Sequence, residues 1–511
     1  MRLDRVKNTK RNIIIGEIDK FISIMLPFII RTMMLHFLGA DYLGLNGLFY
    51  SVLQMLNLVE LGFGTAITYS MYKPIADNDH AKINALLKLY KQIYTIIGIV
   101  TGILGLILMT FLPHLVKEEP PSDVNLYVVY LIFLANCCIN CFLFPNRKAL
   151  LAAFQREDIC GRMHIVTYVV LYSVQIISVC LVKSYYLYAI MVPISSIIYS
   201  SLCAYKSKQI FGQYYEDGEI DDQTKKDIKK QVAGLMVRKI ASYSRDAFDS
   251  MFVSAYLGLK AVAIYGNYYY VMDAVVILIG VIKTSMAGGI GNSIAMETVE
   301  KNHNDMKIIN YMFMLISGWC AICLLCLYQP FMKIWVGEDM TLSFYFSILF
   351  AAYFYVLRMS DIRILYAEAI GIWWQGRYLS IIEAVANVLM NWIFIRHFGL
   401  LGIILSTMIS FFLFNFIGGA IIIYIYYFKG CKISGYFMAQ LKYLIVTLIV
   451  ASVTCYATSL LNVNGIIEII VKGIFCVVIP AVLYFLFYAR TEDFKKARLL
   501  ITQMLGIKKN K

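Results

Sequence analysis

Charge is scarce in this sequence. Only 15% of its 511 residues are Asp, Glu, Lys or Arg, whereas 60% are hydrophobic and the mean hydropathy is +0.70. A soluble protein carries about a quarter of its residues as charged side chains. Apolar runs long enough to cross a bilayer also recur, such as "IIGIVTGILGLILMTFLPHLV" (96–116). The composition therefore predicts an all-α polytopic membrane protein.

Motifs for nucleotides and metals are lacking too. No P-loop lysine motif occurs, so we expect that this chain does not itself hydrolyse ATP to drive transport. The glycine-rich segment "AGGIGNS" (287–293) ends a predicted membrane helix, whereas a nucleotide-binding motif would follow a strand. Cysteine clusters such as "CCINC" (137–141) and "CAICLLC" (320–326) lie in apolar runs with no partner cluster of known proximity. We interpret them as buried thiols, since zinc needs four converging ligands. We expect no metal and no cofactor.

Large extramembrane loops are missing from the predicted topology, and this argues against an enzyme. The triplet "DND" (77–79) has the DxD spacing of metal-dependent glycosyltransferases, but it lies in a short loop with no globular domain attached. A membrane glycan polymerase or glycosyltransferase would need a larger loop with acidic or metal-binding residues. It therefore remains the less favoured alternative.

The excess positive charge, +14 in all, gathers in alternate loops. This bias follows the positive-inside rule, predicts that both termini are cytoplasmic, and argues against a nucleic-acid partner. The first apolar segment is interrupted by Glu17, Asp19 and Lys20, so we expect a retained span and not a signal peptide. The tail from Phe494 alternates basic and apolar residues, so we expect it to lie on the inner leaflet.

We count about fourteen spans, each long enough to cross the hydrocarbon core of a bilayer. The long polar connection at 206–231 falls after the sixth span, and we expect it to be a cytoplasmic linker. It would separate an N-lobe (1–205) from a C-lobe (232–429), followed by two spans and a basic tail (430–511).

An internal repeat supports two related lobes. "LGADYLGLNGLFYSVL" (38–53) aligns without gaps on "LGLKAVAIYGNYYYVM" (257–272), with Gly39 matching Gly258 and Gly47 matching Gly266. Repeats separated by an even number of spans run in the same direction, and transporters of this design bind substrate between the halves.

Charged residues recur within the predicted spans, where each is costly and normally faces a water-filled cavity or a partner. Arg31 would lie about 15 Å inside the first span, close to the midplane, on the face that also carries Lys20. The seventh span carries a stripe that includes Arg238, Arg245 and Asp249. We predict a cationic cavity that binds an anionic headgroup, built from Lys20, Arg31, Arg238, Arg245 and Lys283.

The acidic residues of these spans permit two interpretations. Glu60, Asp249 and Asp273 are candidates for proton or sodium coupling or for ion pairs. Arg358 and Asp361, three residues apart in the predicted tenth span, are expected to form a structural ion pair. Buried pairs that only fix helix packing would explain this pair, and Arg245–Asp249 as well.

Three segments resemble a known family. "FLGADYLGLNGLFYSVLQMLNLVELGFGTAITYSMYKPIA" (37–76) resembles the opening helices of the polysaccharide transporters, the Wzx-like lipid-linked oligosaccharide flippases of the multidrug/oligosaccharidyl-lipid/polysaccharide (MOP) exporter superfamily. "WCAICLLCLYQPFMKIWVGED" (319–339) and "DIRILYAEAIGIWWQGRY" (361–378) resemble a bacterial branch of it. The similarity runs from about residue 11 to 430.

The resemblance implies a cargo and a mechanism. The family moves an oligosaccharide, joined through pyrophosphate to a polyprenyl lipid, by opening a cavity between two lobes to alternate sides. This implies a role in capsule, exopolysaccharide or O-antigen-like synthesis, with the lipid-linked oligosaccharide, the bilayer and the glycan assembly machinery as partners. A multidrug exporter of cations from the same superfamily is the nearest alternative, although its cavity would favour acidic residues.

Overall fold

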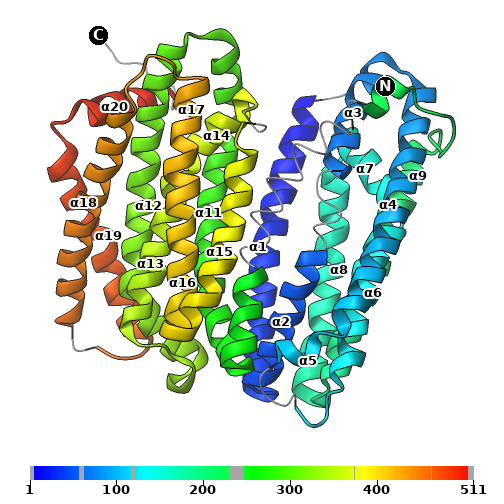
Figure 1. Cartoon of the computed structure of the whole chain (residues 1–511), viewed down its shortest axis with the longest axis horizontal. Coiled ribbons are helices and arrows are strands. Elements are labelled where there is room, and N and C mark those ends of the chain that lie inside the picture. The colour runs from blue at the N-terminus through cyan, green and yellow to red at the C-terminus, as the bar shows by residue number, and fades with distance from the viewer. Residues whose placement is uncertain are drawn as a thin grey trace. The chain divides into compact units, whose positions relative to one another are not determined.

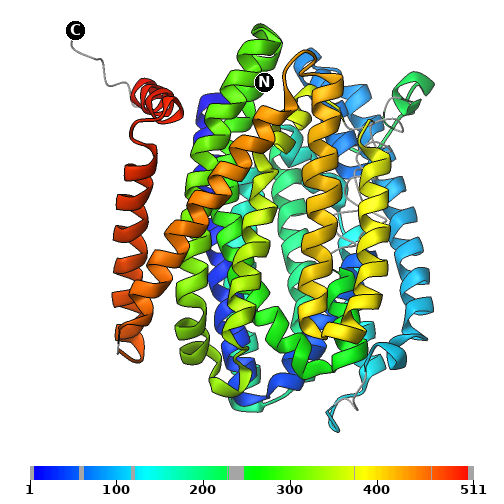
Figure 2. The same cartoon turned by 60° about the vertical axis from the view of Figure 1, so that its left-hand side comes forward.

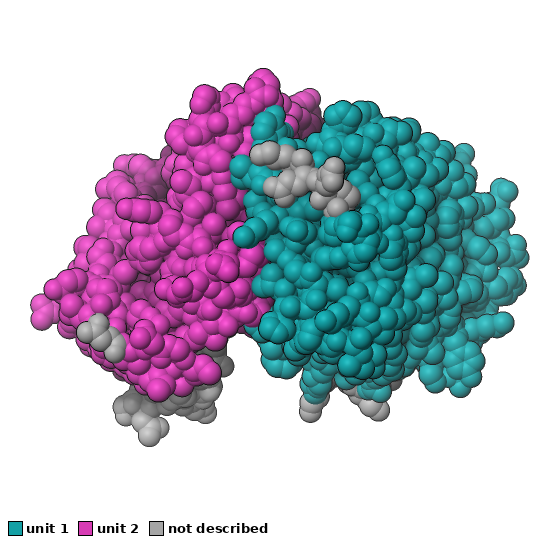
Figure 3. All heavy atoms as spheres, turned by 90° about the horizontal axis from the view of Figure 1, so that it is seen from below, with its two compact units in different colours: residues 1–263 teal, residues 264–511 magenta. Residues whose placement is uncertain are grey.

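The computed structural model describes residues 5–56, 63–116, 121–226, 228, 247–372, 375–461 and 463–504. Within these residues the chain forms helices and loops and no strand. The all-α class of membrane protein is thereby confirmed. The chain divides into two compact units, residues 1–263 and 264–511, which Figure 3 distinguishes by colour.

Unit 1 is a bundle of helices that run along one another (Figure 1). Its labelled elements are α1 (Arg5–Phe37), α2 (Ala40–Leu56), α3 (Phe63–Asp77), α4 (His80–Met109), α5 (Leu112–Leu115), α6 (Leu126–Phe142), α7 (Pro145–Ala153), α8 (Glu157–Ile177), η2 (Ser178–Val182) and α9 (Tyr185–Phe211). Helix α11 (Leu259–Met296) begins in unit 1 and continues into unit 2.

Unit 2 contains the rest of α11 and the elements that follow. They are α12 (Val299–Val336), η3 (Glu338–Met340), α13 (Phe344–Met359), α14 (Asp361–Ile370), α15 (Arg377–Phe398), α16 (Leu400–Ser410), η4 (Phe411–Gly418), α17 (Gly419–Tyr426), α18 (Ile433–Ser459), α19 (Ile466–Tyr488) and α20 (Glu492–Met504). Figure 2 shows α18 and α19 side by side at one edge of this unit, with α20 beyond the end of α19.

Nine helices of the described chain are long and apolar enough to cross a membrane, and a bent pair, α6 with α7, makes a tenth. Two of the spans expected from the sequence extend into residues 57–62 and 229–246, which lie outside the described residues. The nine are α4, α8 with η2, α9, the first part of α11 (Leu259–Lys283), α12, α15, the run from α16 to α17, α18 and α19.

Two breaks in the helices have local causes. Helices α6 and α7 meet at 52°, where Phe144 has a left-handed φ of 51° and Pro145 starts α7. Proline suits the first turn of a helix because it has no N–H to donate there. The tenth predicted span instead breaks at Ser360, where α13 ends and α14 begins. This break carries no proline or glycine, so the sequence did not indicate it.

The repeat seen in the sequence has a local counterpart in the structure. The aligned residues Gly39 and Gly258 both have positive φ, 115° and 90°, and a helix begins just after each of them. Glycine adopts a positive φ at little cost, whereas other residues are strained by it. Both copies of the repeat therefore use glycine to start the next helix.

The first half of the predicted 206–231 linker packs against unit 1. Residues 206–211 complete α9. Glu216 then accepts a hydrogen bond from the Asn146 amide (2.6 Å) and forms an ion pair with Arg147 (3.2 Å). Partial burial raises the pKa of Glu216, but the Asn146 amide and the Arg147 guanidinium outweigh it, and the pKa is lowered overall. The division into lobes at this linker remains a prediction.

Candidate functional site

A polar, tyrosine-rich cavity of about 270 Å³ lies inside unit 1. Five of the residues that line it are tyrosines, and most of the others carry an amide, a hydroxyl or an imidazole. The lining residues are Tyr50, Asn136, Asn140, His164, Thr167, Tyr168, Leu171, Tyr172, Gln175, Tyr188, Val192, Ser195, Ser196 and Tyr199. None of these fourteen is acidic.

Helical spacing explains why these side chains converge. On α8, His164, Tyr168 and Tyr172 are four residues apart, and residues at this spacing share one face of a helix. On α9, Ser195 and Tyr199 share a face in the same way. Helices α6 and α8 both pack against α9, so these polar faces line a common space, to which Tyr50 of α2 also contributes.

One end of the cavity joins α8 to α1. His164 Nδ1 lies 2.6 Å from Asp19 Oδ1, and the imidazole packs against Tyr168 with ring centroids 3.9 Å apart. Lys148 Nζ lies 5.4 Å from the ring centroid of Tyr199, within the range of a cation–π contact. This end therefore combines aromatic rings with one cation and one His–Asp pair.

The other end of the cavity lies near Arg31. The Tyr188 phenol lies close to the Asn46 side chain and within electrostatic range of the Arg31 guanidinium. Gln175 donates a hydrogen bond to the Tyr188 carbonyl (3.1 Å). Asp19 and Arg31 are twelve residues apart on α1, or about 18 Å along the helix. Helix α1 thus follows the cavity from the Asp19–His164 pair to Arg31.

Lys20, the other cation of α1 that we predicted to bind the headgroup, lies nearer the surface than Arg31. Lys20 is about half exposed and pairs with Glu17 at 3.2 Å. Pairs with this exposure contribute little, because water screens them. Arg238, Arg245 and Glu60, which we also predicted to be functional, lie outside the described residues.

Lys283 lies in unit 2, in a cluster of three charges. Its Nζ is 2.9 Å from Asp361 Oδ1, and Arg358 Nη1 is 2.8 Å from Asp361 Oδ2. The side chains of Arg358 and Asp361 are 10% and 7% exposed, and that of Lys283 is 20% exposed. We call Lys283, Arg358 and Asp361 the charge triad. It carries a net charge of +1, with its single carboxylate shared between two cations.

The helix break at Ser360 favours this triad. Arg358 lies in the last turn of α13 and Asp361 in the first turn of α14. Cations are favoured at the C-terminal end of a helix dipole and anions at the N-terminal end. The expected Arg358–Asp361 pair is therefore present, but it joins two helices instead of lying on one.

A second buried network in unit 2 was not predicted from the sequence. Arg363 Nη2 donates to the carbonyl oxygen of Asn415 (3.0 Å) and to its Oδ1 (2.8 Å), and Asn415 Nδ2 lies 3.4 Å from Glu383 Oε2. Asn415 belongs to the π-helix η4, an element frequent at functional sites. A Cβ on Gly419 would clash with Arg363 Nη1, so glycine makes room for the guanidinium.

The remaining acidic candidates belong to different units. Asp249 is buried, 1% exposed, on the helical residues 247–257 of unit 1. Asp273 is partly buried on α11 in unit 2. Their proposed part in coupling therefore remains a prediction for each residue separately.

The described part of the chain holds no group of three or more His, Cys, Asp or Glu residues that could bind a metal ion. The cysteines of these residues are all free. Sequence analysis did not identify the unit 1 cavity. The only trace of this cavity in the sequence is the four-residue spacing of polar and aromatic residues on α8.

The structure is similar to solved structures of transporters. A multidrug resistance MATE family transporter of the MOP superfamily, in its inward-facing conformation, matches with a TM-score of 0.62 and 13% identity, over 83% of this chain and 95% of that one. The lipid II flippase MurJ, in its inward closed conformation, matches with a TM-score of 0.63 and 14% identity, over 93% and 99%. The MATE transporter VcmN of Vibrio cholerae, in its bent form, matches with a TM-score of 0.52 and 14% identity, over 87% and 98%.

No family model and no curated protein matches the sequence. At such low identities the likeness shows the fold, and the fold is that of MOP superfamily transporters. This confirms the superfamily fold that the resemblance implied. These structural neighbours are transporters, and they include a multidrug resistance transporter and a lipid II flippase.

Proposed function

We propose that this chain, with its MOP superfamily fold, is a flippase for a polyprenyl-pyrophosphate-linked oligosaccharide. It would move this lipid from the cytoplasmic to the outer leaflet of a bacterial cell membrane by alternating access. The product would supply the synthesis of a cell-surface polysaccharide such as a capsule, an exopolysaccharide or an O-antigen-like chain.

The observation that carries the proposal is the chemistry of the unit 1 cavity. Its tyrosine rings offer flat apolar faces, and its asparagine amides and serine hydroxyls both donate and accept hydrogen bonds. Sugars present the same combination of hydroxyls and apolar ring faces. About 270 Å³ is just below the roughly 300 Å³ at which small-molecule pockets begin, so the cavity suits part of the cargo.

The same cavity argues against the multidrug alternative. An exporter of organic cations needs negative charge where the substrate binds, whereas the fourteen lining residues include no acid. The nearby Asp19 is paired with His164, and the cations Arg31 and Lys148 lie close to two lining tyrosines. This charge distribution favours an anionic or neutral headgroup.

Energetics explain why such a cavity is needed. Sugars and a pyrophosphate cannot cross hydrocarbon without their hydrogen bonds, because each lost bond costs several kcal/mol. In the proposed mechanism the cavity residues replace this hydration, Arg31 holds the pyrophosphate, and the prenyl tail stays in lipid. Moving two negative charges outward gains roughly 4–5 kcal/mol at 100 mV, inside negative, so the membrane potential can drive the step.

A reconstituted assay tests this proposal directly. Proteoliposomes that contain the protein and a fluorescent lipid-linked oligosaccharide should expose the sugar on the far side at a rate above that of protein-free vesicles. Replacing Ser196 with tryptophan should lower this rate strongly, because the added ring would fill the cavity. A protein that moves cationic dyes but not the oligosaccharide lipid would instead be a multidrug exporter.

A further prediction concerns ion coupling by Asp249 and Asp273. We expect Asp249→Asn or Asp273→Asn to lower transport driven by an ion gradient more than it lowers substrate binding, because the amide keeps the shape but cannot take up a proton or cation. Transport rates measured across pH and sodium titrations would show this. Wild-type rates in both variants would assign the two acids to helix packing instead.

A further inference from the structure

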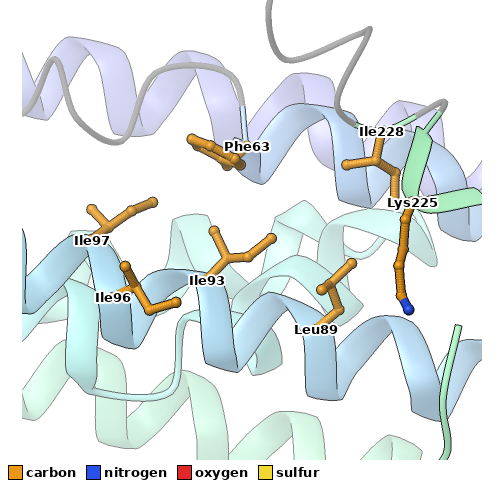
Figure 4. Close-up of a pocket in the computed structure, with 7 residues that line it drawn as sticks. All are labelled: Phe63, Leu89, Ile93, Ile96, Ile97, Lys225 and Ile228. Carbon is orange, nitrogen blue, oxygen red and sulfur yellow. The ribbon is translucent and has the colours of Figure 1, made fainter. Parts of the chain in front are cut away.

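An apolar groove of about 360 Å³ opens in unit 1, away from the tyrosine-rich cavity. Six of its lining residues are apolar: Phe63, Leu89, Ile93, Ile96, Ile97 and Ile228. The seventh is Lys225. Figure 4 shows Lys225 and Leu89 at one end of this groove and Ile96 and Ile97 at the other. The groove is therefore amphipathic along its length, with its cation at one end only.

Charged and apolar residues are distributed along α4 in the same order as along the groove. The charged residues of this helix end at Lys91, and from Gln92 to Met109 it carries no charge. The groove runs from Leu89 to Ile97, about 12 Å of helix, so it starts at the level of the last lysine and continues into the apolar part. The end that carries Lys225 is thus at headgroup level, and the other end reaches acyl-chain depth.

The short helix that carries Lys225 is held in place by well-defined contacts. Asp221 caps the short helix 222–226, because it accepts hydrogen bonds from the Thr224 backbone N–H and hydroxyl, both 2.8 Å. These bonds, aided by Lys82, lower the pKa of Asp221 to about 2, so the cap stays ionised at any physiological pH. Ile220, just before this helix, and Ile228, three residues after Lys225, are buried in the hydrophobic core of unit 1.

The charge of Lys225 remains accessible to a ligand. Its partner Asp222 lies 3.2 Å away, but the two side chains are 47% and 100% exposed. An exposed pair of this kind contributes little, so a lipid phosphate can replace Asp222 as the partner. Lysine is a point charge that suits a phosphate headgroup, and anionic headgroups attract basic residues at this level of the membrane.

We propose that this groove binds an anionic phospholipid of the inner leaflet, with the phosphate at Lys225 and an acyl chain along Ile93, Ile96 and Ile97. The bilayer holds such lipids in large excess over any transport substrate, so mass action favours them as the occupant. The bound lipid would join α4 to the helix 222–226, and it would stabilise unit 1 by its binding free energy. This inference does not depend on the cargo of the protein.

Native mass spectrometry tests the proposal. The full-length protein would be reconstituted with phosphatidylglycerol or with phosphatidylcholine of the same acyl chains, extracted in mild detergent, and scored for retained lipid. We expect phosphatidylglycerol to be retained in preference. Lys225→Gln should weaken this retention about fivefold, the effect of one basic residue near an anionic headgroup, because the amide removes the charge.

Two further variants separate the groove from general surface charge. Lys226 is a matched control, since it is exposed on the same short helix but does not line the groove, and Lys226→Gln should retain lipid as the wild type does. Ile96→Trp, at a side chain that is 61% exposed, should block the groove without unfolding the protein, which a thermal unfolding curve would verify. Equal loss in both lysine variants, retention unchanged by Ile96→Trp, or a polyprenyl lipid retained in place of phosphatidylglycerol would each overturn the proposal.

Discussion

Replacing Arg31 with alanine is expected to abolish flipping of the lipid-linked oligosaccharide while the folded yield stays normal. The guanidinium can hold pyrophosphate through two parallel charge-assisted hydrogen bonds, which an alanine cannot make. Losing one partner of a buried charged contact typically costs about 2–5 kcal/mol, so the rate should fall by at least roughly thirtyfold. Arg31→Lys should keep part of the activity, since lysine retains the charge but lacks the planar fork.

The control for this experiment is another arginine of unit 1. Arg162 on α8 is 53% exposed and lies 3.9 Å from Asp158, which also pairs with Arg156. Arg162→Ala should therefore leave both the yield and the flipping rate close to wild type. Flipping measured in proteoliposomes would be divided by the amount of folded protein, determined by size-exclusion chromatography.

The competing role for Arg31 is structural, and it predicts a different pattern. The guanidinium lies near the Tyr188 phenol, and if its main task is to satisfy groups inside unit 1, its loss should destabilise the fold. Breaking a buried ion pair typically costs about 3–5 kcal/mol of stability. A variant lost mainly to misfolding would assign Arg31 to packing. A well-folded Arg31→Ala protein that flips at the wild-type rate would end the binding hypothesis.

The features that the sequence predicted well are those with a local signal. Membrane class follows from apolar runs, and the glycines that the repeat aligned, Gly39 and Gly258, lie where the structure starts α2 and α11. The Arg358–Asp361 pair was predictable because its members are three residues apart. In each case the deciding information lies within one turn of helix or one uninterrupted run.

Contacts between distant segments could not be predicted in the same way. Lys283 and Asp361 are 78 residues apart, and Asp19 and His164 are 145 residues apart. Any of the 32 acidic residues could in principle pair with any base, so helical periodicity alone cannot choose the partner. The cavity tyrosines posed the same problem, since the chain has 38 tyrosines and only the packing of the helices brings five of them, from α2, α8 and α9, to one cavity.

Lys283 illustrates how this limits a functional prediction. Its position in a membrane helix suggested that its charge binds the cargo, yet in the structure it lies 2.9 Å from Asp361. A lysine with a carboxylate partner still contributes to a triad with net positive charge. Its role in binding therefore stays a proposal, and it has to be separated experimentally from a role in stability.

Replacing Asp361 with asparagine is expected to destabilise the protein more than any other substitution proposed for unit 2. The carboxylate is the shared partner of Lys283 and Arg358, and its loss leaves two mostly buried cations beside a neutral amide. We expect about 3–5 kcal/mol of lost stability, seen as a lower thermal unfolding temperature and a reduced folded yield. Lys301→Gln is the matched control, because Lys301 pairs with Glu297 at an exposed site, where little effect is expected.

Removing all three charges together separates stability from transport. Apolar residues of similar volume often replace a buried ion cluster without loss of stability, so the triple variant Lys283→Met, Arg358→Met, Asp361→Leu should fold better than Asp361→Asn alone. If the triad only fixes the packing of α11, α13 and α14, the folded triple variant should flip at close to the wild-type rate. If Lys283 also contacts the pyrophosphate, the triple variant should fold but not flip, since the net positive charge that attracts the headgroup is gone. A triple variant that is less stable than Asp361→Asn would contradict the view that the unpaired cations cause the instability.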